Sequence, residues 1–204
     1  MKFIVKNYGL QDQDAYLRNF FEANETVNWR EVIFVRYDMV SSTDVQCPIC
    51  MEPLSDMVCP RITKCGHIYC WPCMLQYLEY QKEKSWKRCP LCFDAVYKLD
   101  LKHVQIKKNV YYKEGDIIKF DLMVRSRANT LVKNKQVVGA DHRTILCNGF
   151  SLTNEEEDDP YRNNKVRLNT RQYYKKVLTD DMQKLEENFK FKKSCGEPEL
   201  LPYV

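Results

Sequence analysis

The chain has 204 residues, of which 44% are hydrophobic and 12% aromatic, while six are glycine and eight are proline. This length suits one or two domains, and the composition provides core material while arguing against long flexible linkers. The formal net charge of +4 is modest, although it hides separate basic and acidic stretches. The apolar trio Phe3–Val5 is too short for a signal-peptide core, and no run approaches the roughly 18 residues of a membrane span. We therefore expect a cytoplasmic protein, with the nucleus as the alternative compartment, and no membrane partner.

Two elements are predicted before the first cysteine. Residues Gln11–Ala23 carry apolar side chains at spacings typical of an amphipathic helix, and Trp29–Tyr37 has the alternation and β-branching of a strand. We expect this N-terminal region, residues 1–43, to pack against the module that follows it.

Eight metal-ligand side chains then occur within 46 residues, in the order Cys-x2-Cys-x14-Cys-x-His-x2-Cys-x2-Cys-x15-Cys-x2-Cys. They are Cys47, Cys50, Cys65, His67, Cys70, Cys73, Cys89 and Cys92. Four thiolates, or three thiolates and one imidazole, complete a tetrahedral zinc shell with no open position, which is typical of a structural metal. The sequence therefore predicts two zinc ions.

Disulfide bonds are the alternative use of these cysteines. The two-residue spacing of the Cys pairs matches a zinc knuckle, in which both sulfurs turn toward one ion. Disulfides also require an oxidising compartment, and nothing in the sequence indicates export. Zinc is therefore the favoured interpretation.

The ligand order resembles that of a RING finger, because the histidine is the fourth ligand, within Lys64-Cys65-Gly66-His67. PHD fingers place their histidine fifth and have a tryptophan where this chain has Lys87. The resemblance implies a cross-brace, in which the first and third pairs of ligands hold one ion and the second and fourth hold the other. Metal binding then supplies much of the folding free energy of a small domain, expected here over residues 44–96.

The resemblance also implies a docking surface for a ubiquitin-conjugating enzyme. A helix is predicted from Cys70 to about Glu83. Four residues match the positions with which RING domains contact a conjugating enzyme: Ile49, Tyr77, Pro90 and Leu91. The alternative is that these side chains only pack the core of the RING itself.

A RING ligase performs no covalent chemistry, so the sequence predicts no catalytic residue. It holds a ubiquitin thioester in an attack-ready geometry, which accelerates the reaction by orientation. In many active RING domains a cationic residue follows the last cysteine and donates hydrogen bonds to ubiquitin and its carrier. Phe93 stands there in this chain and cannot donate such a bond. A second element or a partner would then supply that contact.

Residues 97–204 are expected to form an accessory region rich in β-structure and helix. We expect a strand over Ile117–Val124, entered through a turn at Gly115, and a hairpin over Thr130–Val138. The acidic run Glu155–Asp159 predicts an exposed loop. Thr179 precedes two aspartates and is predicted to cap a helix that continues to about Lys190.

Sequences around the RING resemble the RING finger protein 10 family of ubiquitin ligases, whose members are longer. Four stretches carry this resemblance: Asn28–Val35, Ile62–Cys73, Asp100–Val104 and Tyr112–Met123. It implies a ligase that acts on proteins of the small ribosomal subunit during stalled translation.

Other features have less specific interpretations. Basic and aromatic residues in 107–113 suit contact with ribosomal RNA or another nucleic acid, but an ordinary solvated face is the commoner origin of such a mixture. Three cysteines lie outside the ligand set, namely Cys59, Cys147 and Cys195, and we expect buried or incidental thiols rather than nucleophiles. His103 and His142 are expected to be ordinary polar residues.

Together these features predict an α+β protein. It would contain a small zinc-binding cross-brace RING domain of ββα type, an N-terminal helix and strand, and the accessory region. The predicted function is that of a RING-type E3 ubiquitin ligase whose partners are a ubiquitin-conjugating enzyme, ubiquitin and a protein substrate. The alternatives are a non-catalytic RING scaffold and a zinc-stabilised protein that binds ribosomes or nucleic acid.

Overall fold

The structure is a computed structural model that describes residues 1–6, 26–39, 45–80, 85–108, 112–125, 127, 132–135, 165–168 and 171–196. Several sequence predictions lie outside these residues: the helix Gln11–Ala23, the loop Glu155–Asp159, His142 and Cys147. The chain forms two compact units, one from Met1–Ile33 with Val110–Tyr173 and the other from Phe34–Asn109 with Tyr174–Val204. The predicted domain boundaries near residues 43 and 97 stay predictions.

The first unit contains short paired strands. β1 (Lys2–Val5) pairs in parallel with β10 (Val166–Leu168), and Ile4 and Val5 are fully buried there. β8 (Met123–Arg125) pairs antiparallel with β9 (Val132–Asn134). The first unit therefore contains one pair between distant segments, β1 with β10, and one pair between segments close in the sequence, β8 with β9.

The predicted strand over Ile117–Val124 is wrong in most of its length. Residues 117–122 are exposed and form no strand, and only β8 at the end of this stretch is extended and paired. A strand needs a neighbour to satisfy its backbone groups, and within the described residues only β8 finds one here, in β9. The turn at Gly115 is confirmed, since Gly115 has φ +96° and the Asp116 N–H donates to the Lys113 carbonyl at 3.1 Å.

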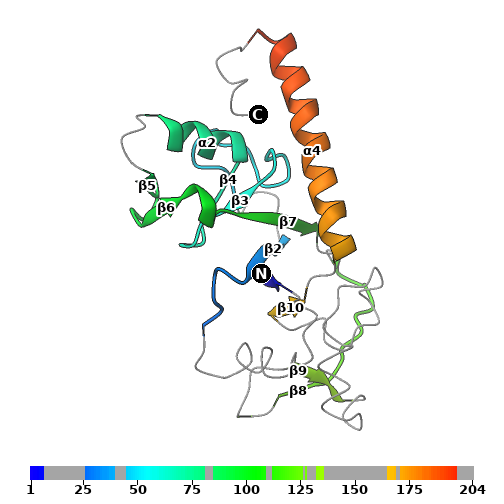
Figure 1. The fold of residues 1–204 in the computed structure, drawn as a ribbon. Coiled ribbons are helices and arrows are strands. Elements are labelled where there is room, and N and C mark those ends of the chain that lie inside the picture. Colours follow the sequence, from blue (N-terminus) through cyan, green and yellow to red (C-terminus); the bar gives the residue numbers. More distant parts are fainter. Residues whose placement is uncertain are drawn as a thin grey trace. The chain divides into compact units, whose positions relative to one another are not determined.

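The second unit has a sheet in the order β2, β7, β3, β4 (Figure 1). β2 (Val32–Met39) runs parallel to β7 (Lys102–Lys108), and β7 runs antiparallel to β3 (Arg61–Ile62). β3 and β4 (Ile68–Tyr69) are antiparallel and bracket the Cys65–His67 turn. β5 (Trp86–Arg88) and β6 (Ala95–Tyr97) form a separate antiparallel pair that precedes the short 3-10 helix η1 (Lys98–Asp100).

The strand predicted over Trp29–Tyr37 exists but begins later, at Val32. A turn occupies the preceding residues, because the Asn28 carbonyl accepts a hydrogen bond from the Glu31 N–H at 3.0 Å. The Asn28 side chain also accepts from the Arg30 N–H at 3.1 Å. Asparagine commonly forms such local turns, so the strand cannot start before they are complete.

The predicted central helix is confirmed as α2 (Trp71–Glu79), which is shorter than expected. It begins directly after Cys70 with a proline in its first turn, where the missing N–H costs nothing. Its buried side chains, which include Met74, Leu75 and Leu78, form the inner face. The helix ends before the predicted Glu83 because Tyr80 adopts an extended conformation.

The C-terminal helix α4 (Arg171–Ser194) is twice as long as the sequence predicted and does not begin at Thr179. The Thr179 hydroxyl donates to the Lys175 carbonyl at 3.0 Å, one turn earlier in the same helix. Threonine can satisfy its hydroxyl in this way inside a helix instead of capping an N-terminus. The predicted N-cap was therefore wrong.

Asp181 holds α4 against the sheet of the second unit. Its Oδ2 atom lies 3.1 Å from Nη2 of Arg61 in β3 and 2.8 Å from Nδ1 of His103 in β7. The Sγ–H of Cys59 donates to the Asp181 carbonyl at 3.3 Å. Arg61 also stacks over the ring of Trp71, 5.1 Å from its centroid. His103 is therefore part of a buried ionic cluster, which corrects the expectation that it is an ordinary polar residue.

Candidate metal centres and docking surface

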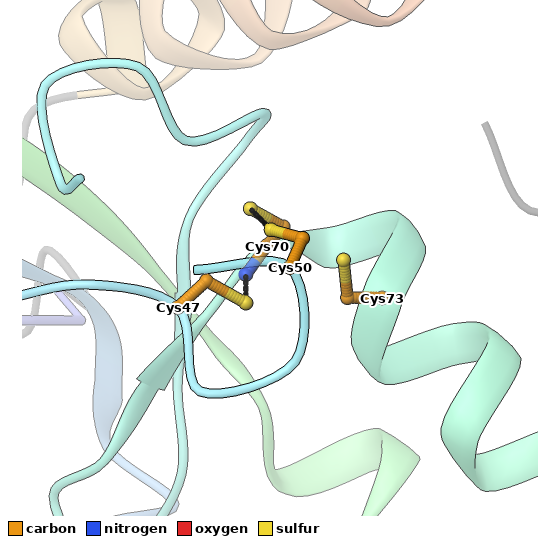
Figure 2. Close-up of side chains that lie close together, drawn as sticks. All are labelled: Cys47, Cys50, Cys70 and Cys73. Carbon is orange, nitrogen blue, oxygen red and sulfur yellow. Dashed lines mark hydrogen bonds between the residues drawn. The ribbon is translucent and has the colours of Figure 1, made fainter. Parts of the chain in front are cut away.

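Four cysteines form a first ligand group: Cys47, Cys50, Cys70 and Cys73. Their sulfur atoms all lie within 4.8 Å of one another, and those of Cys50 and Cys70 are 3.6 Å apart. Figure 2 shows Cys73 on the first turn of α2, with the other three on the chain segments that converge beside it. Zinc–thiolate bonds of about 2.3 Å place two sulfurs of one tetrahedral site about 3.8 Å apart, so these positions fit zinc.

The second ligand group consists of Cys65, His67, Cys89 and Cys92, whose ligand atoms also lie within 4.8 Å of one another. Thr63 organises the turn that carries the first two. Its hydroxyl lies 3.0 Å from the Cys65 sulfur, and the His67 N–H donates to the same oxygen at 3.1 Å. Gly66 between them has φ +91°, a conformation that glycine adopts without strain.

Both groups contain the same tight turn in a Cys-x2-Cys pair. The Met51 N–H donates to the Cys47 carbonyl at 2.8 Å, and the Phe93 N–H donates to the Cys89 carbonyl at 3.0 Å. Met51 and Phe93, each directly after the second cysteine of its pair, have φ +63° and +66°. Such values are uncommon for residues other than glycine. Ligation of both cysteines to one ion would hold each turn in this conformation.

The electrostatics of the first group favour a cation. Hydrogen bonds from Cys70 and Cys73 lower the pKa of Cys47, whereas the contacts of Cys70 with Cys47 and Cys73 raise the pKa of Cys70. The pKa of Cys73 is raised to about 12, chiefly by its contact with Cys47. One thiolate is thus stabilised by neighbouring thiols that resist ionisation themselves. A bound dication would remove this conflict, because it stabilises all four thiolates together.

Tyr69 supports the second group and was not singled out by the sequence. Its hydroxyl lies 3.1 Å from the Cys89 sulfur, and its side chain is fully buried. Burial opposes ionisation of Cys89, but the Tyr69 hydroxyl and nearby backbone N–H groups outweigh this effect and lower the pKa of Cys89 to about 6. Partners of this kind orient metal ligands. The only sequence signal was an aromatic residue beside a ligand cysteine.

The eight predicted ligands thus come together in two groups of the composition that a cross-brace requires, and their chemistry is consistent with two zinc ions. The first group combines the first and third pairs of ligands along the chain, and the second group combines the second and fourth pairs. The mixed α+β fold and its cross-brace are therefore as the sequence predicted.

The predicted docking residues occupy two kinds of environment. Ile49, Pro90 and Leu91 are exposed on the two Cys-x2-Cys turns, with Ile49 39% and Leu91 51% exposed. Tyr77 on α2 is half-buried, and its hydroxyl donates to the Arg88 carbonyl at 2.7 Å. Apolar side chains held outward by rigid turns are unlike the core residues of α2, which face inward.

The two remaining cysteines of the described residues lie in different environments. Cys59 is fully buried, and burial together with Asp181 raises its pKa to about 12. Cys195 is exposed just after α4. A buried thiol with a raised pKa is chemically inert, so Cys59 acts through its contact with α4.

Comparison with known proteins identifies the module. Residues 45–93 match the Ring finger domain family. Human E3 ubiquitin-protein ligase RNF5 is 43% identical over 47 residues, which are 23% of this chain and 23% of the relative. E3 ubiquitin-protein ligase MAG2 of Saccharomyces cerevisiae is 37% identical over 103 residues, or 44% of this chain and 14% of the relative.

A third similarity extends further along this chain than these two. The uncharacterized RING finger protein P8B7.23 of Schizosaccharomyces pombe is 25% identical over 151 residues, or 64% of this chain and 21% of the relative. The chain thus spans less than a quarter of each of these three relatives. Residues 45–93 form a RING finger domain, and the chain shares distant similarity with RING ligases. No helix among the described residues has the length and apolar character needed to cross a membrane.

Proposed function

We propose that the chain is a RING-type E3 ubiquitin ligase. It would bind a ubiquitin-conjugating enzyme through the RING and promote transfer of ubiquitin to a substrate lysine without forming a covalent intermediate. The observation that carries this proposal is the exposure of Ile49, Pro90 and Leu91 on the two metal-binding turns. Similarity to RNF5 and MAG2, both named as ubiquitin ligases, supports the same activity.

The chemistry available to the site agrees with a positioning role. Closed sets of four ligands leave no open coordination position, so zinc would be structural when bound. The chain's own contribution is to present apolar side chains on turns that the metal keeps rigid. An oriented thioester reacts faster because the entropy of arranging the reactants has been lost on binding.

The test is lysine-dependent discharge of ubiquitin from a panel of charged conjugating enzymes by the zinc-loaded chain. Ile49→Ala should lower affinity for the conjugating enzyme at least about tenfold, as expected for a central apolar contact, with both zinc ions retained. Leu99→Ala is the matched control, because Leu99 is a 92% exposed apolar residue in η1, outside the metal-binding turns. Equal effects of the two substitutions, or no discharge by the wild type, would contradict the proposal.

A non-catalytic RING scaffold is the second candidate, and Phe93 favours it. The side chain is 69% exposed and provides no hydrogen-bond donor beside the docking residues. If the scaffold is correct, the wild type binds a conjugating enzyme without accelerating discharge, and Phe93→Arg creates acceleration. Discharge by the wild type would instead support a ligase that works without a cation at this position.

We further propose, from the sequence resemblance, that the chain belongs with the RING finger protein 10 family and acts on small-subunit ribosomal proteins. Similarity that extends beyond the RING, over 103 residues with MAG2 and 151 with P8B7.23, supports a relationship larger than one zinc module. Ubiquitination of purified small ribosomal subunits, with large subunits as the control, tests the substrate. Modification of both subunits alike would contradict it.

A further inference from the structure

One lysine of β5 reaches back to the end of α2. The Lys87 ammonium group donates to the carbonyl of Tyr77 at 2.5 Å and also to the carbonyl of Tyr80. It lies 5.0 Å and 5.4 Å from the ring centroids of the same two tyrosines. Lys87 thus contacts both the backbone and the aromatic faces of the last turn.

These contacts satisfy a specific need of this helix. The last carbonyls of any helix have no partner within it, and they carry the negative end of its dipole. α2 has only nine residues and no basic side chain in its own last turn. Helices this short are marginal in water. Lys87 therefore brings, from a strand outside the helix, a cation that bonds directly to carbonyls at the end of α2.

The next residue makes a second link in the same place. The Tyr77 hydroxyl donates to the Arg88 carbonyl at 2.7 Å. Residues 87 and 88 pair with β6 and lead directly through Cys89 to Pro90 and Leu91. Two adjacent residues of β5 are thus attached to the part of α2 that carries Tyr77.

We propose that Lys87 is a positioning residue that sets Tyr77 of α2 and the Pro90–Leu91 pair in one surface for the conjugating enzyme. This inference rests on the proposed function, because it concerns how the same docking surface is built. Zinc bound to the second ligand group would fix Cys89 and Cys92, on both sides of Leu91. It would not hold the end of α2, because the ligand that this helix carries, Cys73, lies in its first turn. Lys87 and the Tyr77 hydroxyl supply that missing link.

The geometry separates Lys87 from Ile49. Ile49 lies on the turn of the first ligand group, between Cys47 and Cys50, whereas Lys87 lies in β5, which leads into the turn of the second ligand group. Removing the Lys87 charge should therefore reduce the coupling between Tyr77 and Leu91 in affinity for the conjugating enzyme. It should leave the contribution of Ile49 to that affinity unchanged. Surfaces that are ordered before binding lose less entropy when they bind, so the effect should appear in affinity.

The experiment compares Lys87→Met with Lys98→Met in the full zinc-loaded chain. Methionine keeps an unbranched apolar stem in place of the ammonium group. Lys98 is the matched control, because it also lies at the end of α2 but pairs with the partly exposed side chain of Glu79, at 3.3 Å, and not with a helix carbonyl. For a conjugating enzyme that the wild type binds, Lys87→Met should raise Kd about five- to tenfold, as loss of a charge-assisted hydrogen bond predicts. Lys98→Met should change Kd less than twofold, because exposed ion pairs contribute little.

Two readouts distinguish positioning from general damage. Both variants should retain two zinc ions, and at saturating charged conjugating enzyme the Lys87→Met discharge rate should return to the wild-type rate. In affinity, the coupling between Tyr77→Ala and Leu91→Ala should be present in the wild type and shrink in the Lys87→Met background. Equal Kd for Lys87→Met and wild type, or undiminished coupling, would overturn the inference.

A measurement without any conjugating enzyme separates this inference from the proposed function. The Tyr80 N–H donates to the Gln76 carbonyl at 2.9 Å at the end of α2. In Lys87→Met its amide exchange should accelerate at least about tenfold, and the amide chemical shift of Leu91 should move, while Lys98→Met leaves both unchanged. If both readouts stay at the wild-type values in Lys87→Met, the inference fails even if the chain is a ligase. If both readouts change but the wild type binds no conjugating enzyme, the proposed function fails. The link between the end of α2 and the Cys89–Cys92 turn then remains.

Discussion

The RING and the C-terminal helix of the second unit are held in place by different means. The RING is organised by two ligand groups whose eight members lie within 46 residues. Helix α4 is organised by one carboxylate, Asp181, which meets Arg61 and His103 from far earlier in the chain. The spacing of the zinc ligands is visible in the sequence, whereas the contacts of Asp181 exist only once the sheet has formed.

The two arrangements also differ in how they tolerate burial of charge. Thiolates around a dication neutralise it, so a closed zinc shell favours both the metal and its ligands. For Asp181, burial raises the pKa, but His103 and Arg61 outweigh burial and lower the pKa below its usual value. Loss of either partner would therefore remove one of the two contacts that favour this carboxylate. Breaking either arrangement should reveal how far the two depend on each other.

The largest effect is expected from Cys65→Ser. Loss of one thiolate opens the second ligand group, and the free energy of structural zinc binding, about 10–16 kcal/mol in small zinc domains, is largely folding free energy. We expect loss of zinc from this group and unfolding of the RING. Metal content and circular dichroism measure both.

Cys195→Ser is the matched control for that substitution, because Cys195 is exposed and lies outside both ligand groups. It should retain two zinc ions and the wild-type spectrum. A folded Cys65→Ser variant with two bound zinc ions would show that the second group does not hold metal as described.

A smaller effect is expected from Asp181→Asn. Removing one member of a buried ionic cluster costs about 3–5 kcal/mol, because the remaining charges lose their partner. We expect α4 to detach from β3 and β7 while the RING keeps both zinc ions. Limited proteolysis within α4, together with metal content, measures the separation.

Asp180 provides a control at the neighbouring position, since it is exposed on the same turn of α4. Asp180→Asn should leave proteolysis unchanged. If Asp181→Asn also releases zinc, the two regions are coupled, and the difference drawn between them is wrong. If Asp181→Asn behaves like Asp180→Asn, the ionic cluster does not hold α4.

This difference explains which parts of the molecule could be predicted from sequence. The ligands could be identified because zinc requires fixed residue types at short spacings, and α2 followed from apolar periodicity between them. The C-terminal end of α2 could not be predicted, since it coincides with contacts from Lys87, seven residues beyond Tyr80 in the chain. Sequence patterns carry no direct signal for a cap donated by another strand.

The roles of His103 and Asp181 could not be predicted from the sequence for the same reason. Each is an ordinary surface residue type, and only the pairing of β3 with β7 places His103 beside Arg61. Tyr69 was hidden less completely, because an aromatic residue adjoining a ligand cysteine is a visible feature of the sequence. The docking residues were identified by their place inside the ligand pairs, but their interaction with a conjugating enzyme stays a prediction.

The smallest effect tests the corrected start of α4. If Thr179 capped a helix, Thr179→Ala would destabilise it by about 1 kcal/mol. In the structure Thr179 lies inside α4 and its hydroxyl donates to the Lys175 carbonyl, so alanine should instead stabilise the helix by about 0.5 kcal/mol through its higher helix propensity. Denaturant unfolding of the wild type and of Thr179→Ala measures this difference in the free energy of unfolding. Thr179→Ser is the control that keeps the hydroxyl. The sign alone decides, because destabilisation that serine rescues would restore a helix start at Thr179, whereas stabilisation shows that α4 continues through Thr179 toward Asp181.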